Sequence, residues 1–318
     1  MYYIGVDLGG TSIKVGILNS EYEIIQSATL PTRRERAAEE ILEDMAMVCK
    51  EVMSEAGITE KEIHSIGIGC PGIASPKEGV VIYSSNLNFR NVNVKKEIQK
   101  YIDSDVFVEN DANAATLGEA ICGAAKGKGS VVMVTLGTGI GGGIILNGKI
   151  FGGAYFGGGE IGHHVIALEN GIPCGCGRTG CWEQYASATA LIRQAKQVAT
   201  QNPNSALVTL AKGNAINNIT AKTVFDAADQ GDAVAEEVLD QYFKYIAQGV
   251  ANIVNILQPE AIVIGGGVSA QKGKLTEPVR KYVQDEMYGG LELQTEIKAA
   301  TLGNDAGIIG AALIGTRL

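Results

Sequence analysis

The 318-residue chain is 46% hydrophobic and 19% charged, which places it among folded globular proteins and excludes a disordered or fibrous class. Its net charge of -9 argues against a surface for phosphate backbones or anionic lipid, so we expect no nucleic-acid and no membrane partner. No apolar run approaches the roughly 20 residues that span a bilayer, and MYYIGVDLGG predicts a strand in place of a signal sequence. We therefore expect a cytoplasmic protein of about two domains.

Glycine is the unusual component of the sequence, with 42 residues. Many of these glycines gather in short runs beside apolar segments, in GG, GTGIGGG, FGGAYFGGGE and IGGG. Glycine is favoured where a backbone turns tightly or approaches a ligand closely. The runs therefore indicate loops that hold phosphate.

The first half of the chain alternates strands and helices. Residues 3–19, YIGVDLGGTSIKVGILN, predict a strand, a Gly-Gly-Thr turn and a second strand. Apolar residues at helical spacing predict an amphipathic helix over 35–57, which Gly57 ends. Further elements follow in chain order, with strands at 64–72 and 105–111 and an Ala-rich helix at 112–125.

The second half contains a copy of the opening segment. Asp7 to Asn19, DLGGTSIKVGILN, aligns with Thr135 to Asn147, TLGTGIGGGIILN, with the leucine, the first glycine and the terminal I-L-N in register. This internal repeat predicts two related halves. Strands followed by helices indicate the α/β class. The remaining elements are predicted as helices at 186–199, 232–257 and 305–318 and as a strand with a glycine turn at 261–268.

Two glycine loops, DLGGT and GTGIGGG, suit an anionic ligand because backbone N–H groups in glycine turns bind anionic oxygens. Neither loop matches the Walker pattern or the protein-kinase glycine array, and residues 137–142 fit G-x-G-x-x-G only loosely. Each loop alone is equally consistent with a glycine-rich hairpin that binds nothing. The duplicated pair, together with IGGG at 264–267, favours a nucleotide.

The segment VFVENDANAA places Asp111 where a strand ends and a helix begins. A carboxylate on such a rigid element could project into a site as a catalytic group. However, Asn and Asp just before a helix most often cap it. From the local sequence alone, a capping role for Asn110 or Asp111 is therefore the favoured interpretation.

Three of the six cysteines, Cys174, Cys176 and Cys181, lie in the glycine-rich segment PCGCGRTGCWEQ. A disulfide is disfavoured in a cytoplasmic protein, and burial as small apolar side chains suits Cys49, Cys70 and Cys122 better than this loop. Three thiolates and one imidazole form a closed structural zinc site. A metal is thus the favoured interpretation, with His163 or His164 as the fourth ligand, and spacing does not choose between them.

Five motifs of this chain together resemble the ROK family of sugar kinases, in the family's order and over essentially the whole chain. They are DLGGT, GTGIGGG, ENDAN at 109–113, GGGEIGH at 157–163 and CGCGRTGCWE at 174–183. The resemblance implies an α/β, actin-like ATPase (ribonuclease H-like) fold with two lobes around a central cleft. The lobes are expected at 1–112 plus 303–318 and at 113–302. With the first glycine loop at residue 7, we expect no winged-helix module of the kind found in family repressors.

The resemblance also implies an activity, the transfer of the ATP γ-phosphate to the 6-hydroxyl of glucose, with Asp111 as the general base and Mg²⁺ as cofactor. N-acetylmannosamine, N-acetylglucosamine and fructose are alternative substrates, and a non-catalytic sugar sensor or an actin-like filament protein are alternative classes. Family members suggest a homodimer or a higher homo-oligomer.

The family motifs assign site residues by position. His163 becomes the fourth ligand of a structural Zn²⁺, and one of its ring nitrogens is expected to face the sugar. The sugar contacts are expected from Gly72, Asn86, Asn110, Asp111, Glu160, His163 and Glu183. The ATP and Mg²⁺ contacts are expected from Asp7, Gly9, Gly10, Thr11, Lys14, Gly137, Thr138, Gly139, Gly265, Gly266 and Gly267.

Overall fold

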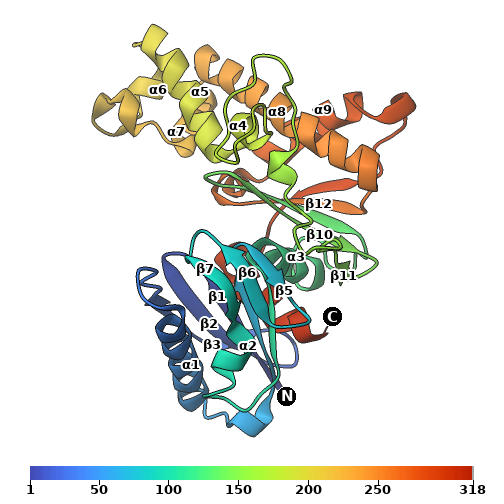
Figure 1. Ribbon diagram of the computed structural model, residues 1–318. Coiled ribbons are helices and arrows are strands. Elements are labelled where there is room, and N and C mark those ends of the chain that lie inside the picture. Colours follow the sequence, from blue (N-terminus) through green and yellow to red (C-terminus); the bar gives the residue numbers. More distant parts are fainter. Residues whose placement is uncertain (317–318) are drawn as a thin grey trace. The chain divides into compact units, whose positions relative to one another are not determined.

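The computed structural model describes residues 1–316, which form two compact units (Figure 1). Unit 1 contains Met1–Met133, Gly143–Gly159 and the chain from Thr301 onward, and unit 2 contains Val134–Gly142 and Glu160–Ala300. The predicted functional lobes, 1–112 plus 303–318 and 113–302, stay a prediction, because compact units and functional lobes need not share boundaries.

Unit 1 is built on a five-stranded sheet in the order β3-β2-β1-β4-β8. The predicted opening hairpin is confirmed, since β1 and β2 pair antiparallel with Asp7 opposite Lys14. Strands β4 and β8 then extend the sheet in parallel with β1. The strands are β1 (Tyr2–Leu8), β2 (Ser12–Leu18), β3 (Ile24–Pro31), β4 (Ile63–Cys70) and β8 (Val106–Asn110).

Helix α1 (Ala38–Glu55) confirms the amphipathic helix expected over 35–57. Its buried face, which includes Leu42 and Met45, joins Ile4 and Val6 of β1 in one apolar core. The helix ends before Gly57, whose φ of 68° lies in the left-handed region that glycine adopts at low cost. Other elements of this unit include α2 (Val94–Ile98), α3 (Asp111–Ile121), α10 (Ala306–Leu313) and a small antiparallel sheet of β5 (Ile73–Ser75), β6 (Val80–Ser84) and β7 (Phe89–Asn93).

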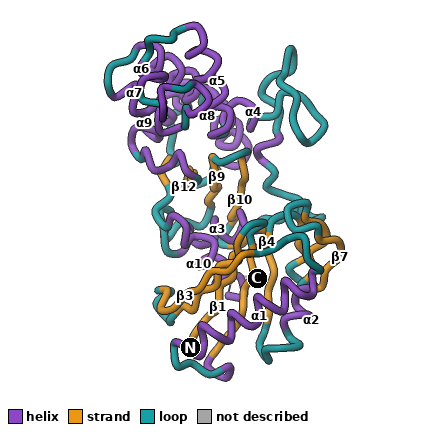
Figure 2. The backbone as a smooth tube through the Cα atoms, turned by 90° about the vertical axis from the view of Figure 1, so that its left-hand side faces the viewer, coloured by secondary structure: helices purple, strands orange, loops and turns teal. Residues whose placement is uncertain are grey.

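Helix α10 packs on the sheet with backbone against backbone, and it lies beside α3 (Figure 2). A Cβ atom added at Gly5 of β1 would lie 1.9 Å from the carbonyl oxygen of Ile308, and one at Gly67 of β4 would lie 1.7 Å from that of Ala311. Side chains alternate between the faces of a strand, so Gly5 faces α10 while its neighbours face α1. Several glycines of this chain therefore serve packing and not ligand binding.

A second five-stranded sheet has the order β11-β10-β9-β12-β13. If the strands of each sheet are numbered in chain order, both sheets have the spatial order 3-2-1-4-5. The internal sequence repeat therefore corresponds to a repeated strand order. The turn of the second copy joins β9 to β10, as the alignment predicts. The strands are β9 (Val131–Leu136), β10 (Ile140–Leu146), β11 (Lys149–Ile150), β12 (Ala261–Gly265) and β13 (Glu296–Ala299).

The helices of unit 2 surround the long helix α8 (Ala233–Leu257), which is capped by Asp232 and ends at Gln258 in a left-handed conformation. The only tryptophan, Trp182, is buried against Gly249 of this helix, where a Cβ would lie 2.0 Å from the indole ring. The predicted helices over 186–199 and 232–257 are thus confirmed. The other helices are α4 (Glu183–Ala186), α5 (Ala188–Gln201), α6 (Ala206–Thr209), α7 (Ala221–Asp229) and α9 (Gly273–Asp285).

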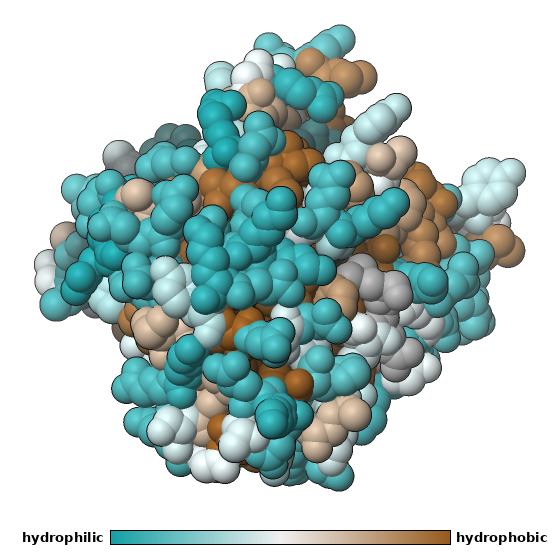
Figure 3. Space-filling model, turned by 60° about the horizontal axis from the view of Figure 1, so that its bottom comes forward, coloured by the Kyte–Doolittle hydropathy of each residue, from teal (hydrophilic) through white to brown (hydrophobic). Residues whose placement is uncertain are grey.

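On the face drawn in Figure 3, hydrophilic residues predominate and apolar residues are interspersed among them. Across residues 1–316, none of the helices combines the length and the apolar character that a bilayer crossing requires.

The glycine contacts of α10 predict that a single added methyl group lowers the stability of the fold substantially. In a Gly310→Ala variant, the new Cβ would lie 1.6 Å from the carbonyl oxygen of Ala114 in α3, so the two helices must separate. We expect this overpacking to lower the free energy of unfolding by about 3 kcal/mol. Chemical denaturation followed by circular dichroism measures the loss.

Gly273→Ala is the matched control, because at this first residue of α9 the only atoms near the new Cβ belong to the end of the flexible Glu277 side chain. It should leave stability unchanged or slightly raised. Equal stabilities of the two variants would contradict the packing argument.

Candidate functional site

The carboxyl ends of three parallel strands of unit 1 carry polar residues expected at the site. Asp7 near the end of β1 is paired in register with Gly69 of β4, and Cys70 is paired with Asn110 at the end of β8. In open α/β sheets, ligands bind outside the carboxyl ends of the strands. The topology thus brings Asp7, Asn110 and the segment after β4 to one edge of the sheet.

Asn110 is the N-cap of helix α3. Its side-chain oxygen accepts hydrogen bonds from the N–H groups of Ala112 and Asn113 at 2.9 and 3.1 Å, and its Nδ2 donates to the carbonyl oxygen of Gly72 at 3.0 Å. Gly72 can adopt its φ of 104° without strain because it has no Cβ. The capping interpretation is therefore confirmed for Asn110, which also ties Gly72 to the start of the helix.

Asp111 is the first residue of α3, so the cap does not occupy this position. Its Oδ1 accepts from the N–H of Ala112 at 2.9 Å. The residue is half-buried. Burial raises the pKa of the neighbouring Cys70 thiol, and the charge of Asp111 adds to that shift. Its assignment as the general base stays a prediction.

Glu109 is a site-supporting residue that the sequence analysis quoted within ENDAN but did not assign. The side chain is 5% exposed, and its Oε1 accepts from the Asn110 N–H at 2.7 Å and from Asn113 Nδ2 at 2.9 Å. Burial raises the pKa of this carboxyl group, and the two hydrogen bonds partly oppose that effect. The sequence did contain one indication of this role, because Glu109 is an acidic residue in an otherwise apolar strand segment.

The first glycine loop, from Gly9 to Thr11, is held by its neighbours in unit 1. The Thr32 hydroxyl donates to the Gly9 carbonyl oxygen at 2.6 Å, a contact that the sequence did not indicate. Gly10 lies against Asn86, because a Cβ added there would be 3.2 Å from the Asn86 carbonyl oxygen. The predicted phosphate loop and the predicted sugar residue Asn86 are thus neighbours.

Lys14 and Asp7 form an ion pair across the β1–β2 hairpin, with 3.3 Å between Nζ and Oδ2. The Asp7 carboxylate also lies beside Gly307 in the first turn of α10, where an added Cβ would be 3.1 Å from the carboxyl carbon. A cation and an anion in this arrangement can contribute to a phosphate–metal site, although the roles assigned to the two residues stay predictions.

The other two glycine loops meet within unit 2. Gly137 donates its N–H to the Gly139 carbonyl oxygen at 3.0 Å and accepts a hydrogen bond from the Ala188 N–H at 3.0 Å, which forms a tight turn around the exposed Thr138. The third loop starts at Gly265, the last residue of β12. It lies against the second, since a Cβ at Gly266 would be 2.4 Å from the Leu136 carbonyl oxygen, and Gly267 then opens a short 3₁₀ turn.

His163, Cys174, Cys176 and Cys181 form a compact cluster in unit 2, with their potential ligand atoms all within 4.8 Å of one another. Sγ of Cys176 and Sγ of Cys181 are 3.6 Å apart, and Nδ1 of His163 is 3.7 Å from Sγ of Cys174. Zinc–sulfur bonds of about 2.3 Å in a tetrahedron separate two sulfurs by about 3.8 Å. The donor set and its spacing fit a closed structural zinc site.

The two adjacent histidines have different surroundings. His163 belongs to the cluster, whereas the ring of His164 packs against that of Trp182 with 5.0 Å between their centroids. Burial lowers the pKa of His164. The structure thus distinguishes two candidates that sequence spacing left open.

Two carboxylates face the imidazole of His163. Nδ1 lies 3.9 Å from Oε1 of Glu183, and Nε2 lies 4.0 Å from Oε2 of Glu160. Glu183 also accepts a hydrogen bond from the Cys174 thiol at 3.0 Å. The residues predicted for metal and sugar in this unit therefore share one site.

Electrostatics distinguishes the cluster thiols from one another. Burial raises the pKa of Cys174 to about 12, whereas a backbone hydrogen bond from Arg178 lowers the pKa of the exposed Cys176. Of the three cysteines outside the cluster, Cys49 and Cys70 are buried as expected. Cys122, which follows α3, is only half-buried.

Comparisons with known proteins agree with this geometry. The family model described as "ROK family" matches residues 3–317. A glucokinase of Halalkalibacterium halodurans is 38% identical over 97% of this chain and 93% of its own length, and one of Thermotoga maritima is 38% identical over 98% and 96%. The crystal structure of a ROK family glucokinase from Streptomyces griseus, in complex with glucose and AMPPNP, matches with a TM-score of 0.80 at 35% identity and 98% coverage of both chains.

The repeated strand order and these structural matches define the actin-like ATPase fold, an α/β fold with two lobes, as the sequence predicted. The chain belongs to the ROK family.

The cap at Asn110 predicts that replacing this asparagine lowers the stability of the protein more than replacing the cap of another helix. An Asn110→Ala variant loses two capping hydrogen bonds and the tie to Gly72, so we expect it to lower the free energy of unfolding by about 2 kcal/mol. Asn93→Ala removes a single capping bond from α2 and should cost about 1 kcal/mol or less. Denaturant titration of both variants decides the ranking, and a costlier Asn93→Ala change would refute it.

Proposed function

We propose that this chain is an ATP-dependent glucokinase that transfers the γ-phosphate of ATP to the 6-hydroxyl of glucose. The family membership and the glucokinase relatives support a sugar kinase. The observation that carries the proposal is the β8–α3 turn, where Asn110 caps the helix and leaves Asp111 as its first residue. The Asp111 carboxylate therefore lies directly after the carboxyl end of β8, where ligands bind in open α/β sheets.

Asp111 is the proposed general base. Phosphoryl transfer requires an acceptor hydroxyl held in line with the γ-phosphate and relieved of its proton. Because Asn110 is bonded both to α3 and to Gly72, the direction of the strand–helix turn is fixed. The Asp111 carboxylate is thereby presented from a rigid element, as a positioned base requires.

The nucleotide is proposed to bind at the glycine loops that begin at Gly9, Gly137 and Gly265. The N–H groups of Gly9 and Gly137 donate within their own turns, and the glycines of these loops place no side chain in the way of the phosphates. Lys14 would bind phosphate oxygens, and Asp7 would hold the water shell of Mg²⁺, which neutralises charge on the transferred phosphoryl group.

The residues proposed to recognise the sugar are Gly72, Asn86, Asn110, Asp111, Glu160, His163 and Glu183. Carboxylates and amides accept and donate several hydrogen bonds to hydroxyls, so a substrate that lacks a hydroxyl leaves a buried polar group unpaired. N-acetylmannosamine, N-acetylglucosamine and fructose remain the alternative acceptors of the same mechanism.

His163, Cys174, Cys176 and Cys181 would hold a structural Zn²⁺. The metal would fix the loop through its ligands and leave no open coordination position for chemistry. In the metal site, Nδ1 of His163 is the nitrogen that faces the sulfurs, and Nε2 faces Glu160. This arrangement supports an imidazole that links the metal loop to the proposed sugar site. A homodimer and a cytoplasmic location stay predictions from the family resemblance.

Substitution of Asp111 tests the base. With Mg-ATP and glucose, we expect Asp111→Asn to lower kcat by about 10³-fold, because an amide does not accept the hydroxyl proton. Glucose affinity, measured by calorimetry, should change by less than about threefold, since the amide still forms hydrogen bonds. A coupled assay with glucose, mannose, fructose and the two N-acetylhexosamines ranks the substrates in the same experiment.

Asp103→Asn, an exposed carboxylate before β8, is the matched control and should retain full turnover. Retention of turnover by Asp111→Asn would remove the base assignment. A wild-type protein that turns over none of the sugars would remove the kinase proposal as a whole.

Metal analysis tests the cluster. We expect about one zinc per chain in purified protein, and a loss of most of that metal in Cys176→Ser, because closed zinc sites need all their thiolates. Cys122→Ser, which changes a cysteine outside the cluster, should keep its zinc. The KM for sugar should rise in Cys176→Ser more than kcat falls, since the metal orients His163 without taking part in the reaction. Equal zinc contents in the two variants would exclude the site.

A further inference from the structure

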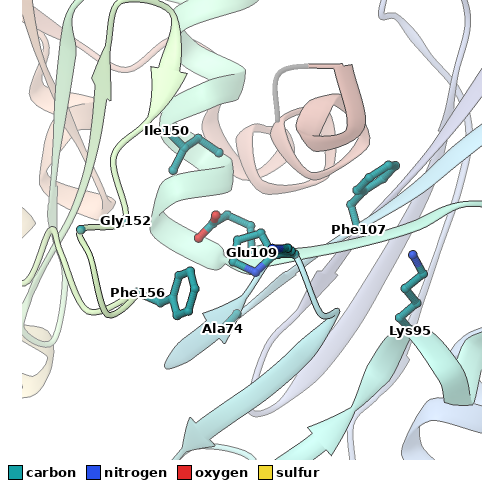
Figure 4. A pocket seen from close by; sticks show the side chains of 10 residues that line it. Ala74, Lys95, Phe107, Glu109, Ile150, Gly152 and Phe156 are labelled. Atoms are coloured by element: carbon teal, nitrogen blue, oxygen red, sulfur yellow. The ribbon is translucent and has the colours of Figure 1, made fainter.

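Unit 1 contains a cavity of about 460 Å³ (Figure 4), and of the site residues described above only Glu109 lines it. It lies between β8, the β5–β6 region, the start of α2 and the loop that follows β11. None of its lining residues is among those proposed to bind sugar, nucleotide or zinc. The lining residues are Ala74, Pro76, Lys77, Lys95, Phe107, Glu109, Ile150, Gly152, Gly153 and Phe156.

The buried carboxylate of Glu109 is the main polar group of this cavity. Its Oε1 is occupied by the two hydrogen bonds to Asn110 and Asn113, but within residues 1–316 no donor bonds to Oε2. Figure 4 shows the carboxylate directed into the space between Ile150 and Phe156. The residue is only 5% exposed, and an acceptor oxygen that faces a cavity with no donor from the described part of the protein suits a ligand that donates a hydrogen bond.

Two lysines give the cavity a cationic side. The stem of Lys95 is held across Gly79, where an added Cβ would be 2.4 Å from the Lys95 Cβ, and its N–H donates to the Gly79 carbonyl oxygen at 3.1 Å. Neither Lys77 nor Lys95 forms an ion pair with any part of the chain that the structure describes. In Figure 4, Lys95 and Phe107 lie on the other side of Glu109 from Phe156. The site thus combines an acceptor, aromatic and aliphatic walls, and unpaired cations.

We propose that this cavity binds a phosphorylated sugar. A sugar hydroxyl would donate to Glu109 Oε2, the apolar face of the ring would pack on Phe156, and the phosphate would be bound by Lys95 and Lys77. Carboxylates paired with sugar hydroxyls and ammonium groups paired with phosphate are the complementary contacts for such a ligand. A neutral sugar leaves the lysines unused, and inorganic phosphate leaves Glu109 unused, so both bind more weakly.

Calorimetric titration of the full-length protein with glucose 6-phosphate tests the proposal. Saturating glucose and AMPPNP are present throughout, so that a product site at the catalytic residues is blocked. We expect binding to persist under these conditions, to weaken at least tenfold in Lys95→Ala, and to weaken at least fivefold in Glu109→Gln and in Phe156→Ala. Inorganic phosphate, titrated under the same conditions, should bind at least tenfold more weakly than the sugar phosphate.

Lys96→Ala is the matched control, because Lys96 is the exposed neighbour of Lys95 and does not line the cavity. It should bind within twofold of the wild type. Glu160→Ala, which alters the proposed sugar site, should also leave this binding unchanged, so a failure of the kinase proposal and a failure of the cavity proposal give different results. The cavity proposal is overturned if glucose and AMPPNP abolish binding, if Lys95→Ala binds like Lys96→Ala, or if inorganic phosphate binds as tightly as the sugar phosphate. Since Lys95 and Phe156 are not part of the catalytic turn, their variants decide the matter even where Glu109→Gln affects folding.

Discussion

The contact on which unit 1 depends is the direct packing of α10 on the backbones of β1, β4 and α3. Gly5, Gly67 and Gly310 leave no room for a side chain at these crossings, with carbonyl oxygens less than 2 Å from where a Cβ would lie. Such a close approach gives dense packing but tolerates no added volume. The same contact sets the Asp7 carboxylate beside the first turn of α10, so the packing of the core also determines the position of a site residue.

A buried carboxylate fixes the segment that leads into this helix. Glu119 of α3 is fully buried, and its Oε1 accepts the backbone N–H groups of Thr301 and Leu302 at 2.9 and 2.8 Å, while Oε2 accepts that of Ala124 at 2.7 Å. Backbone donors stabilise a buried carboxylate without a cationic partner. Helix α3, which begins with Asp111, is consequently tied at one end to Gly72 through Asn110 and at the other to the start of α10.

The sequence predicted the element order, the repeat and the grouping of Cys174, Cys176 and Cys181 with a histidine because each depends on local pattern. Strand periodicity and the aligned DLGG and TLGT segments correspond to strands with equivalent places in two sheets. The roles of Glu109, Glu119 and Thr32 were not predictable, because a buried acid and a surface acid look alike until the fold supplies their hydrogen-bond donors. Glycines were a second difficulty, because the same residue type serves different purposes. Gly67 allows a helix to pack closely on the sheet, whereas Gly10 lies in a loop, and composition does not distinguish these uses.

In unit 2, one side chain joins the metal loop to a glycine loop. Glu183 accepts the Cys174 thiol through Oε1 and the Ile140 N–H through Oε2 at 3.4 Å, and its Oε2 fills the space beside Gly139. Residues 137–139 precede β10 directly, so an ordered cysteine loop also orders the turn proposed for phosphate. A metal held by His163, Cys174, Cys176 and Cys181 would require Cys174 as a thiolate, which would no longer donate to Oε1 of Glu183. A structural metal in this loop would therefore influence both substrates of the proposed reaction through the position of a single carboxylate.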